Sequence, residues 1–283
     1  MDLSELARTL AAVALQQRIY TMEMAHLHGP LHVGGDLSAS DILTVLFQNE
    51  MNLCMNDLSY SNRDRFVLSK GHGAGALYIA MALRGYYSIE DLFDTYMEHG
   101  SRFGLHPCKE SLPALECSSG SLGHGLSIAV GMSMAAKMDG LSYRVFCLIG
   151  DGELAEGSIW EAVMAAAQFK LDNLIAIIDF NKITLDGFTK DIMNVEPLVD
   201  KFQAFNWHTV EVNGNSIEEL LWAFNECKND TSGKPKVIVA HTIKGFGVSF
   251  MENDPLYHSA TLSDEDKNRA IDELKSRFGE VAL

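Results

Sequence analysis

Two polar residues follow two apolar runs of the chain and could hold a metal ion. Asp151 stands in the triplet GDG (150–152), directly after the apolar run 144–149, and Asn181 follows the run 174–179. Carboxylate and amide oxygens suit hard divalent cations, and Mg²⁺ in particular combines one or two protein oxygens with phosphate oxygens of a ligand. The pair therefore predicts a metal-bridged diphosphate site for Mg²⁺, or for Ca²⁺ or Mn²⁺ in its place.

The elements around this pair must bring it together. The segment between the two apolar runs has the pattern of a helix, which makes the unit a strand, a crossover helix and a second strand. Such crossovers are almost always right-handed and join parallel strands, whose carboxyl ends lie at one edge of the sheet. We therefore expect Asp151 and Asn181 to be neighbours at that edge, where open α/β sheets bind their ligands.

The rest of the chain repeats the alternation of strands and helices. A strand, a glycine-rich turn and a helix are expected within 65–85, and further strands at 207–214 and 235–243. Helices are expected at 2–28, after a capping serine within 29–48, within 86–100 and 118–140, at 217–229 and from Ser263 onward, with an irregular loop at 101–118. This pattern predicts an α/β fold in a single domain spanning 1–283, a doubly wound, mostly parallel sheet with helices on both faces.

Bulk properties restrict the partners. A net charge of −16 argues against nucleic acid and against anionic membrane surfaces, because neutralising phosphates requires Lys and Arg. The N-terminal segment has the pattern of an amphipathic helix rather than of a signal peptide, and no apolar run approaches the roughly 18–20 residues of a membrane span. Five scattered cysteines without a C-x-x-C pair favour reduced thiols, and thus a cytoplasmic protein.

The pattern around the metal pair resembles the thiamine-diphosphate signature of the transketolase family. The carriers of the resemblance are GDG-x-x-x-E-G from Gly150, Asn about 30 residues later, and its continuation NKITLDG. The loop SSGSLGHG (118–125) also matches the family segment SxGxLGxG. A tight GDG turn and an asparagine that merely ends a strand are the structural alternative, which the combined spacing disfavours. The resemblance covers essentially the whole chain, but only the first domain of a full-length transketolase.

The resemblance implies thiamine diphosphate as the cofactor. Its metal ion would be held by Asp151, the side chain of Asn181 and the main-chain carbonyl of Ile183. Glycines let the main chain approach an anion closely at the start of a helix. Glu153 is counted among the cofactor-binding residues, although an acid at this position also suits the start of a helix. The implied cofactor-binding residues are Gly120, Ser121, Leu122, Gly123, Gly150, Asp151, Gly152, Glu153, Asn181, Ile183, Lys244, His72 and His258.

Histidines in glycine-rich segments are the implied catalytic residues. In the family, histidines at matching motifs touch the diphosphate, the donor sugar or the acceptor, which here gives His32, His72, His106 and His258. Neutral imidazoles suit this work because they exchange protons near neutral pH and hydrogen-bond sugar hydroxyls. His124 stands where many relatives have Gln, so that its role is open. The segments LHVGG and FGLHP depart from the family pattern and leave the substrate open.

Glu156 is the fifth implied catalytic residue, because it matches a family glutamate at the subunit interface. The structural alternative for Glu156 is a solvated acid at the start of a helix.

The resemblance also implies a partner. Transketolases activate the cofactor with a glutamate on a separate pyrimidine-binding domain, and the roughly 40 residues after 243 are too few for one, since each strand–helix–strand unit needs about 30. This chain would be the N-terminal subunit of a split transketolase, in an α2β2 heterotetramer with a separately encoded C-terminal subunit. Together they would transfer a two-carbon ketol (glycolaldehyde) unit from a ketose donor, a sugar or sugar phosphate, to an aldehyde acceptor.

Two other functions stay open on the residues. A specialised enzyme could pass the two-carbon unit to a lipoyl or carrier-protein thiol, and a non-catalytic scaffold could merely bind the cofactor. A nicotinamide dehydrogenase is disfavoured, because no G-x-G-x-x-G follows the first strand.

Overall fold

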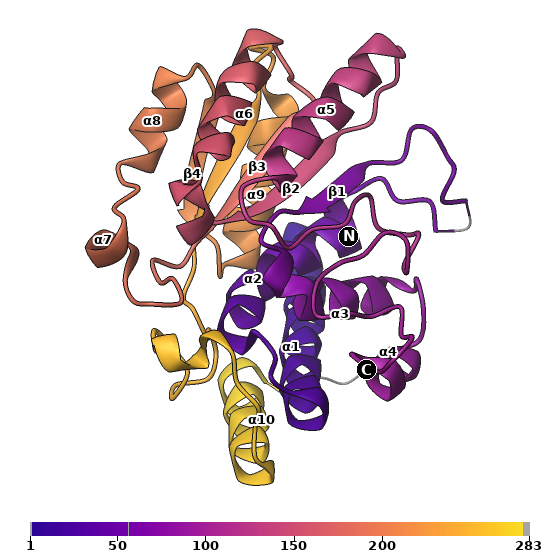
Figure 1. The fold of residues 1–283 in the computed structure, drawn as a ribbon, viewed down its shortest axis with the longest axis vertical. Coiled ribbons are helices and arrows are strands. Elements are labelled where there is room, and N and C mark those ends of the chain that lie inside the picture. The colour runs from indigo at the N-terminus through magenta and orange to yellow at the C-terminus, as the bar shows by residue number, and fades with distance from the viewer. Residues whose placement is uncertain (1, 56, 280–283) are drawn as a thin grey trace.

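A parallel sheet forms the centre of the protein, whose computed structural model describes residues 2–55 and 57–279 (Figure 1). Its order is β1-β2-β3-β5-β4, and every neighbouring pair is parallel. The strands are β1 (Arg65–Leu68), β2 (Val145–Gly150), β3 (Leu174–Phe180), β4 (His208–Asn213) and β5 (Lys236–His241). The predicted α/β class with a mostly parallel sheet is confirmed.

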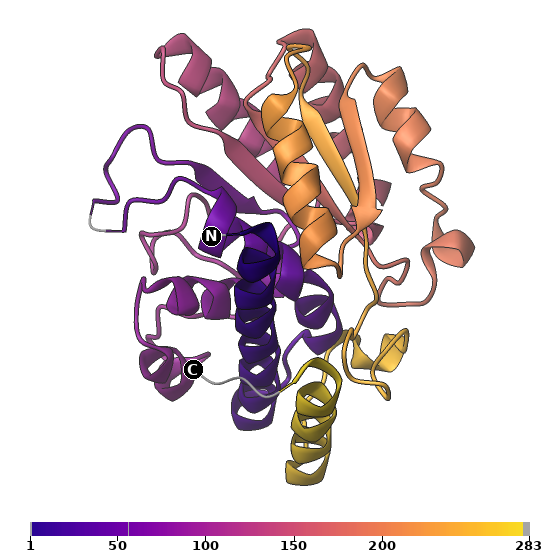
Figure 2. The same cartoon turned by 180° about the vertical axis from the view of Figure 1, so that it is seen from behind.

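Helices cover both faces of this sheet. In front of it in Figure 1 lie α5 (Gly125–Met138), α6 (Gly157–Gln168) and α8 (Leu198–Ala204). The opposite face, seen in Figure 2, carries α1 (Leu3–His28), α2 (Val33–Val45), α3 (Ala74–Arg84) and α9 (Ile217–Asn229). Shorter elements are η1 (Leu46–Glu50), η2 (Gly71–Gly73), α4 (Ile89–Thr95), η3 (Gly152–Ala155), α7 (Thr189–Ile192) and η4 (Pro255–His258), and α10 (Asp264–Phe278) follows them.

The central strands divide their side chains between two cores. In β2, Phe146 and Leu148 pack with α1, α2 and α3, whereas Cys147 and Ile149 pack with α5 and α6. Such two-sided burial explains the continuous apolar runs of β2 and β3, because both faces of each strand are covered. The register pairs Gly150 with Asp179, so the residues that follow the two strands leave the sheet side by side.

The start of α2 differs from the prediction of a capping serine. The helix begins at Val33, so Ser38 and Ser40 lie inside it. Both hydroxyls are used otherwise: Ser38 donates to the carbonyl of Gly35 and to the carboxylate of Asp179, and Ser40 donates to the carbonyl of Asp36. Tertiary contacts, rather than a cap, therefore explain these serines.

Helices α9 and α10 each begin with a serine cap, the second at the predicted Ser263. Ser216 accepts a hydrogen bond from the main chain of Glu219 at the start of α9, and Ser263 accepts one from Asp266 at the start of α10. The segment 189–204, for which no element was predicted, forms α7 and α8. Within the described ranges, no helix is long and apolar enough to cross a membrane.

Candidate active site

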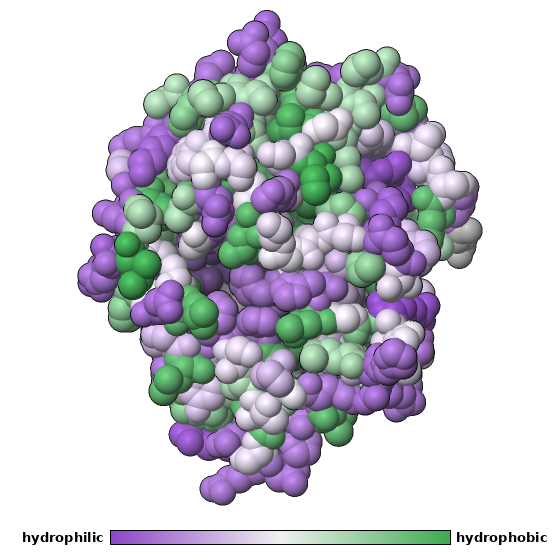
Figure 3. Space-filling view, in the orientation of Figure 1, coloured by the Kyte–Doolittle hydropathy of each residue, from purple (hydrophilic) through white to green (hydrophobic). Residues whose placement is uncertain are grey.

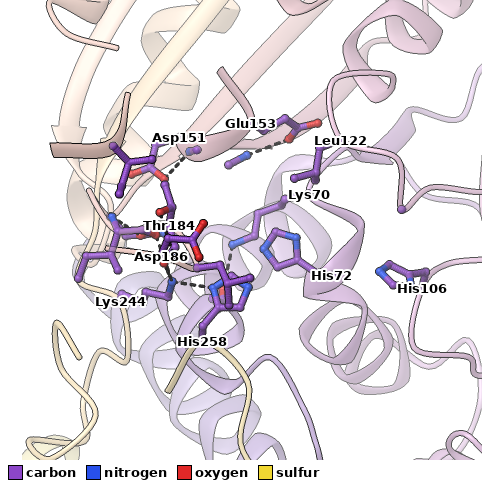
Figure 4. Close-up of a pocket in the computed structure, with 18 residues that line it drawn as sticks. Lys70, His72, His106, Leu122, Asp151, Glu153, Thr184, Asp186, Lys244 and His258 are labelled. Atoms are coloured by element: carbon purple, nitrogen blue, oxygen red, sulfur yellow. Dashed lines mark hydrogen bonds between the residues drawn. The ribbon is translucent and has the colours of Figure 1, made fainter. Parts of the chain in front are cut away.

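A cavity of about 380 Å³ lies at the carboxyl ends of β2 and β3 (Figure 4). In the space-filling view, hydrophilic side chains cross a hollow in the middle of the face that Figure 1 shows (Figure 3). The cavity is lined by the predicted metal residues Asp151, Asn181 and Ile183, and by three of the predicted histidines, His72, His106 and His258. Segments that are far apart in sequence thus converge where the strand pattern placed the site.

The residues of the predicted metal pair are neighbours. Asp151 is 2% exposed and Asn181 is 6% exposed. One carboxylate oxygen of Asp151 accepts a hydrogen bond from the main chain of Lys182, the residue after Asn181, and the other accepts one from Gly152 at 2.7 Å. These bonds fix the Asp151 carboxylate against the end of β3.

The donor set fits a hard divalent cation. It comprises a carboxylate, the amide oxygen of Asn181, which accepts from the main chain of Ile183 at 3.1 Å, and the Ile183 carbonyl. Burial, and then the neighbouring Asp179, raise the pKa of Asp151 to about 7. A cation beside this carboxylate would favour its ionised form, because opposite charge offsets the cost of burial.

Lys244 is buried beside the predicted metal ligands. Its Nζ donates to the carbonyls of Ile183 at 3.1 Å and Thr184 at 2.9 Å, and lies 2.8 Å from Nδ1 of His258. Burial, and then Lys70, lower the pKa of Lys244 to about 8. An ammonium can only donate, so Nδ1 of His258 accepts and the ring proton of the neutral imidazole sits on Nε2.

The four predicted histidines form one cluster. The ring centres of His32, His72 and His258 are 5.3–5.4 Å apart, and His106 lies 6.5 Å from His32. Burial, followed by neighbouring cationic groups, lowers the pKa of His32 to about 4 and of His258 to about 3, and holds the pKa of His72 well below its usual value. These three imidazoles are therefore neutral near pH 7.

A buried ion pair lies beneath the cavity. Nζ of Lys70 donates to the Asp179 carboxylate at 2.5 Å and to the carbonyl of Gly35 at 3.1 Å. Asp179 also accepts from the hydroxyls of Ser38 at 2.6 Å and of Thr242. Burial alone would raise the pKa of Asp179, but Lys70 and the hydrogen bonds outweigh it and lower that pKa.

Glu153 connects the glycine-rich loop to the end of β2. Its carboxylate accepts from the Ser69 hydroxyl and from the main chain of Gly123 at 2.7 Å and Gly150 at 3.1 Å. Burial raises the pKa of Glu153. Because Glu153 occupies the N–H of Gly123, it holds the loop in place as well as lining the cavity.

The glycine-rich loop contributes Gly120 and Leu122 to the cavity wall. Gly120 has a φ of +148°, and a Cβ there would lie 3.2 Å from the ring of His106, so glycine is required at this close approach. Ser121 is exposed and, like Gly123, is not part of the lining.

Some residues singled out in the sequence lie outside the cavity. Glu156 is exposed at the start of α6, and His124 is exposed before α5. His32 contacts the rings of the lining histidines rather than lining the cavity itself.

Sequence reasoning missed several residues of the site. Lys70 precedes Gly71 in SKGHG, and Asp179 is an acid inside an apolar run; an ion pair between them was not anticipated. Leu185, Asp186 and Ile192 also line the cavity, and the fold of 184–192 brings them back to it. The acid within a buried strand was the one available signal, since a buried carboxylate needs a partner.

Comparison with known proteins decides the family. A family model described as the thiamine diphosphate binding domain of transketolase matches residues 10–281. The chain belongs to the transketolase family.

Known relatives include proteins named as transketolase subunits. The chain is 41% identical over 270 residues to an apulose-4-phosphate transketolase subunit of Phocaeicola vulgatus, a match that covers 95% of both chains. It is 42% identical over 258 residues to a 6-deoxy-6-sulfo-D-fructose transketolase subunit of a Clostridium species, covering 91% of this chain and 93% of the relative. The match to these transketolase subunits extends over nearly their whole length.

Solved transketolases are matched over less than half of their length. The structure of the Campylobacter jejuni enzyme superposes with a TM-score of 0.86 at 30% identity, covering 97% of this chain and 43% of that one. This protein is therefore a transketolase-type enzyme subunit that corresponds to the N-terminal part of the full-length enzymes and carries the thiamine diphosphate binding domain.

Replacing Lys70 by methionine should leave the Asp179 carboxylate buried without a cation. We expect the free energy of unfolding to fall by about 3–5 kcal/mol, as for other broken buried pairs. The double variant Lys70→Met/Asp179→Leu should recover most of this loss, because it removes both charges. Urea unfolding measures both effects, with Lys228→Met on the exposed side of α9 as the control. A loss below about 1 kcal/mol for Lys70→Met would contradict the role of the pair.

The neutral histidines predict how stability depends on pH. Between pH 6.5 and about 4, the unfolded chain binds protons on His32 and His258 that the folded chain does not bind. Stability is therefore highest above pH 6.5 and falls as the pH falls towards these lowered pKa values. The variant His32→Asn/His258→Asn should show a flatter dependence of the urea midpoint between pH 7 and pH 5, whereas exposed His124→Asn should keep the original one. Equal slopes in all three proteins would refute this assignment.

Proposed function

We propose that this chain binds the diphosphate of thiamine diphosphate through Mg²⁺, for which Ca²⁺ or Mn²⁺ can substitute, and transfers a two-carbon ketol unit from a ketose donor to an aldehyde acceptor. The convergence of Asp151, Asn181 and the Ile183 carbonyl with the histidine cluster in one cavity carries the proposal. When bound, thiamine diphosphate would supply the nucleophilic carbon that attacks the ketose carbonyl, so that the C2–C3 bond of the ketose can be cleaved.

The residues of the cavity divide the work by their chemistry. Asp151, Asn181 and Ile183 offer the oxygens that would hold the metal ion. Lys244 would face the phosphate end with its ammonium. The other assigned cofactor contacts are Gly120, Ser121, Leu122, Gly123, Gly150, Gly152, Glu153, His72 and His258.

The clustered histidines would bind the sugar and move its protons. His72, His106 and His258 line the cavity, and His32 supports their rings. Neutral imidazoles both donate and accept, so they can hydrogen-bond sugar hydroxyls and exchange a proton with them. We keep Glu156 as a residue of the subunit interface, in keeping with its exposed position at the start of α6.

A partner protein with a pyrimidine-binding domain would complete the site. The names of several relatives describe them as single subunits of a transketolase, which implies a separate second subunit. Leu185 and Ile192 line one rim of the cavity, and together with Phe188 and Met193 of the same segment they are 42–62% exposed. Clustered exposed apolar side chains favour a protein contact. We place the partner against this rim in an α2β2 assembly, with residues 1–283 as one domain and the cytoplasm as the predicted location.

An anionic ketose is the substrate class we favour. Two relatives are named for apulose-4-phosphate and 6-deoxy-6-sulfo-D-fructose. Among the described residues that line the cavity, no arginine is present, and both lysines have other roles: Lys70 pairs with Asp179, and Lys244 is assigned to the diphosphate of the cofactor. The partner would therefore bind the charged group of the sugar.

Asp151→Ala tests the function in the complex reconstituted with the partner protein. We expect the affinity for thiamine diphosphate in the presence of Mg²⁺ to fall by more than about 100-fold, beyond the upper end for the loss of an outer-shell partner. Calorimetry measures the binding, and a coupled assay measures ketol transfer from a ketose phosphate to an aldehyde. Asp200→Ala, at an exposed position of α8, is the matched control.

Three outcomes separate the alternatives. Unchanged cofactor affinity of Asp151→Ala with an intact fold would refute the site. Transfer to a carrier thiol without ketose–aldose exchange would favour the specialised acceptor. Cofactor binding without any turnover would favour a non-catalytic scaffold that only binds the cofactor.

A further inference from the structure

The loop that carries Lys244 is held by a side chain from another turn of the protein. Residues 242–247 follow β5, and the main-chain N–H of Ile243 donates to Oδ1 of Asn215 at 2.8 Å. Asn215 lies in the turn between β4 and α9, outside the cavity lining. The next residue, Lys244, is buried and places its Nζ on the Ile183 carbonyl. Asn215 is therefore hydrogen-bonded to the residue that directly precedes Lys244.

The other end of the Asn215 amide is fixed as well. Its Nδ2 donates to the Asp41 carboxylate at 3.1 Å and to the carbonyl of Ser38 at 3.3 Å. Both of these groups can only accept, and the N–H of Ile243 can only donate, so a single orientation of the amide satisfies all three. Asn215 thus links α2 to the loop after β5 by hydrogen bonds.

A buried ion pair anchors this network. Arg18 of α1 makes a two-point contact with Asp41, in which Nη1 donates to Oδ1 at 3.1 Å and Nη2 donates to Oδ2. The Arg18 guanidinium also lies 5.0 Å from the ring centre of Phe246, on the same loop as Lys244. The loop is therefore held on both sides of Lys244, at Ile243 by an amide and at Phe246 by a cation.

Close packing leaves this loop little freedom. A Cβ at Gly214, next to Asn215, would lie 2.6 Å from the methyl group of Thr242 and 2.8 Å from the Cβ of Ala240. The turn after β4 thus touches the end of β5 directly. Three contacts of 2.8–3.1 Å fix the Lys244 ammonium, and they extend from a main chain that is itself held at Ile243.

We propose that Asn215 is a positioning residue for cofactor binding. Held by the Arg18–Asp41 pair, it fixes the Lys244 ammonium at the wall of the cavity, where its positive charge would raise the affinity for the diphosphate group. Asn215 touches neither cofactor nor substrate and acts through Lys244. This inference rests on the proposed function, because it concerns the same site.

The test compares Asn215→Ala with Asn225→Ala, an exposed position on α9, in the complex with the partner protein. Asn215→Ala should weaken thiamine diphosphate binding in calorimetry by about tenfold, as expected for an outer-shell partner. Turnover at saturating cofactor should stay within about twofold of the original, because only binding is affected. In the cofactor-free complex, hydrogen exchange over 241–247 should become faster in Asn215→Ala alone.

A double-mutant cycle distinguishes positioning from a general structural role. If Asn215 acts through Lys244, Asn215→Ala should weaken binding no further in a Lys244→Met background. Additive losses, or an Asn215→Ala complex with the original affinity, would overturn the inference. A failure of the original complex to bind thiamine diphosphate would overturn the proposed function together with it, whereas the other two results leave that function standing.

Discussion

The buried ion pair between Lys70 and Asp179 is the interaction on which the cavity depends. Lys70 follows β1, Asp179 lies near the end of β3, Ser38 comes from α2, and Thr242 follows β5. One carboxylate therefore joins three strand ends and a helix beneath the site. A buried pair adds little net stability, but losing one partner is costly. Its main effect is to fix where the loops leave the sheet, and hence where Lys244, His72 and Asp151 meet.

The charges of the cavity favour the proposed use of a metal ion with an anionic cofactor. Three carboxyl groups line it, those of Asp151, Glu153 and Asp186, against the two ammonium groups of Lys70 and Lys244, in a chain of net charge −16. A diphosphate placed there without a cation would meet a field of its own sign. His32 and His258 add no charge near neutral pH, since burial lowers their pKa to about 4 and about 3. A divalent cation at the Asp151 carboxylate reverses this balance locally.

Only part of this arrangement could be predicted from the sequence. The meeting of Asp151 and Asn181 was predictable, because a crossover between parallel strands brings their ends to one edge. The histidines followed from family motifs, which single out residues but not their distances. The link from Asn215 to Lys244 could not be predicted, because it depends on the tertiary placement of a turn. The start of α2 was predicted wrongly, since Ser38 matches a helix cap in type but bonds to Asp179 in the fold.

We propose that this chain is one half of a transketolase and needs a partner protein to complete its site. Native mass spectrometry of the chain purified from its own host, with thiamine diphosphate and Mg²⁺ present, measures whether such a complex exists. We predict a complex of two copies of this chain with two copies of a second, different protein, holding two cofactors. A homo-oligomer of this chain alone, without bound cofactor, would contradict the account.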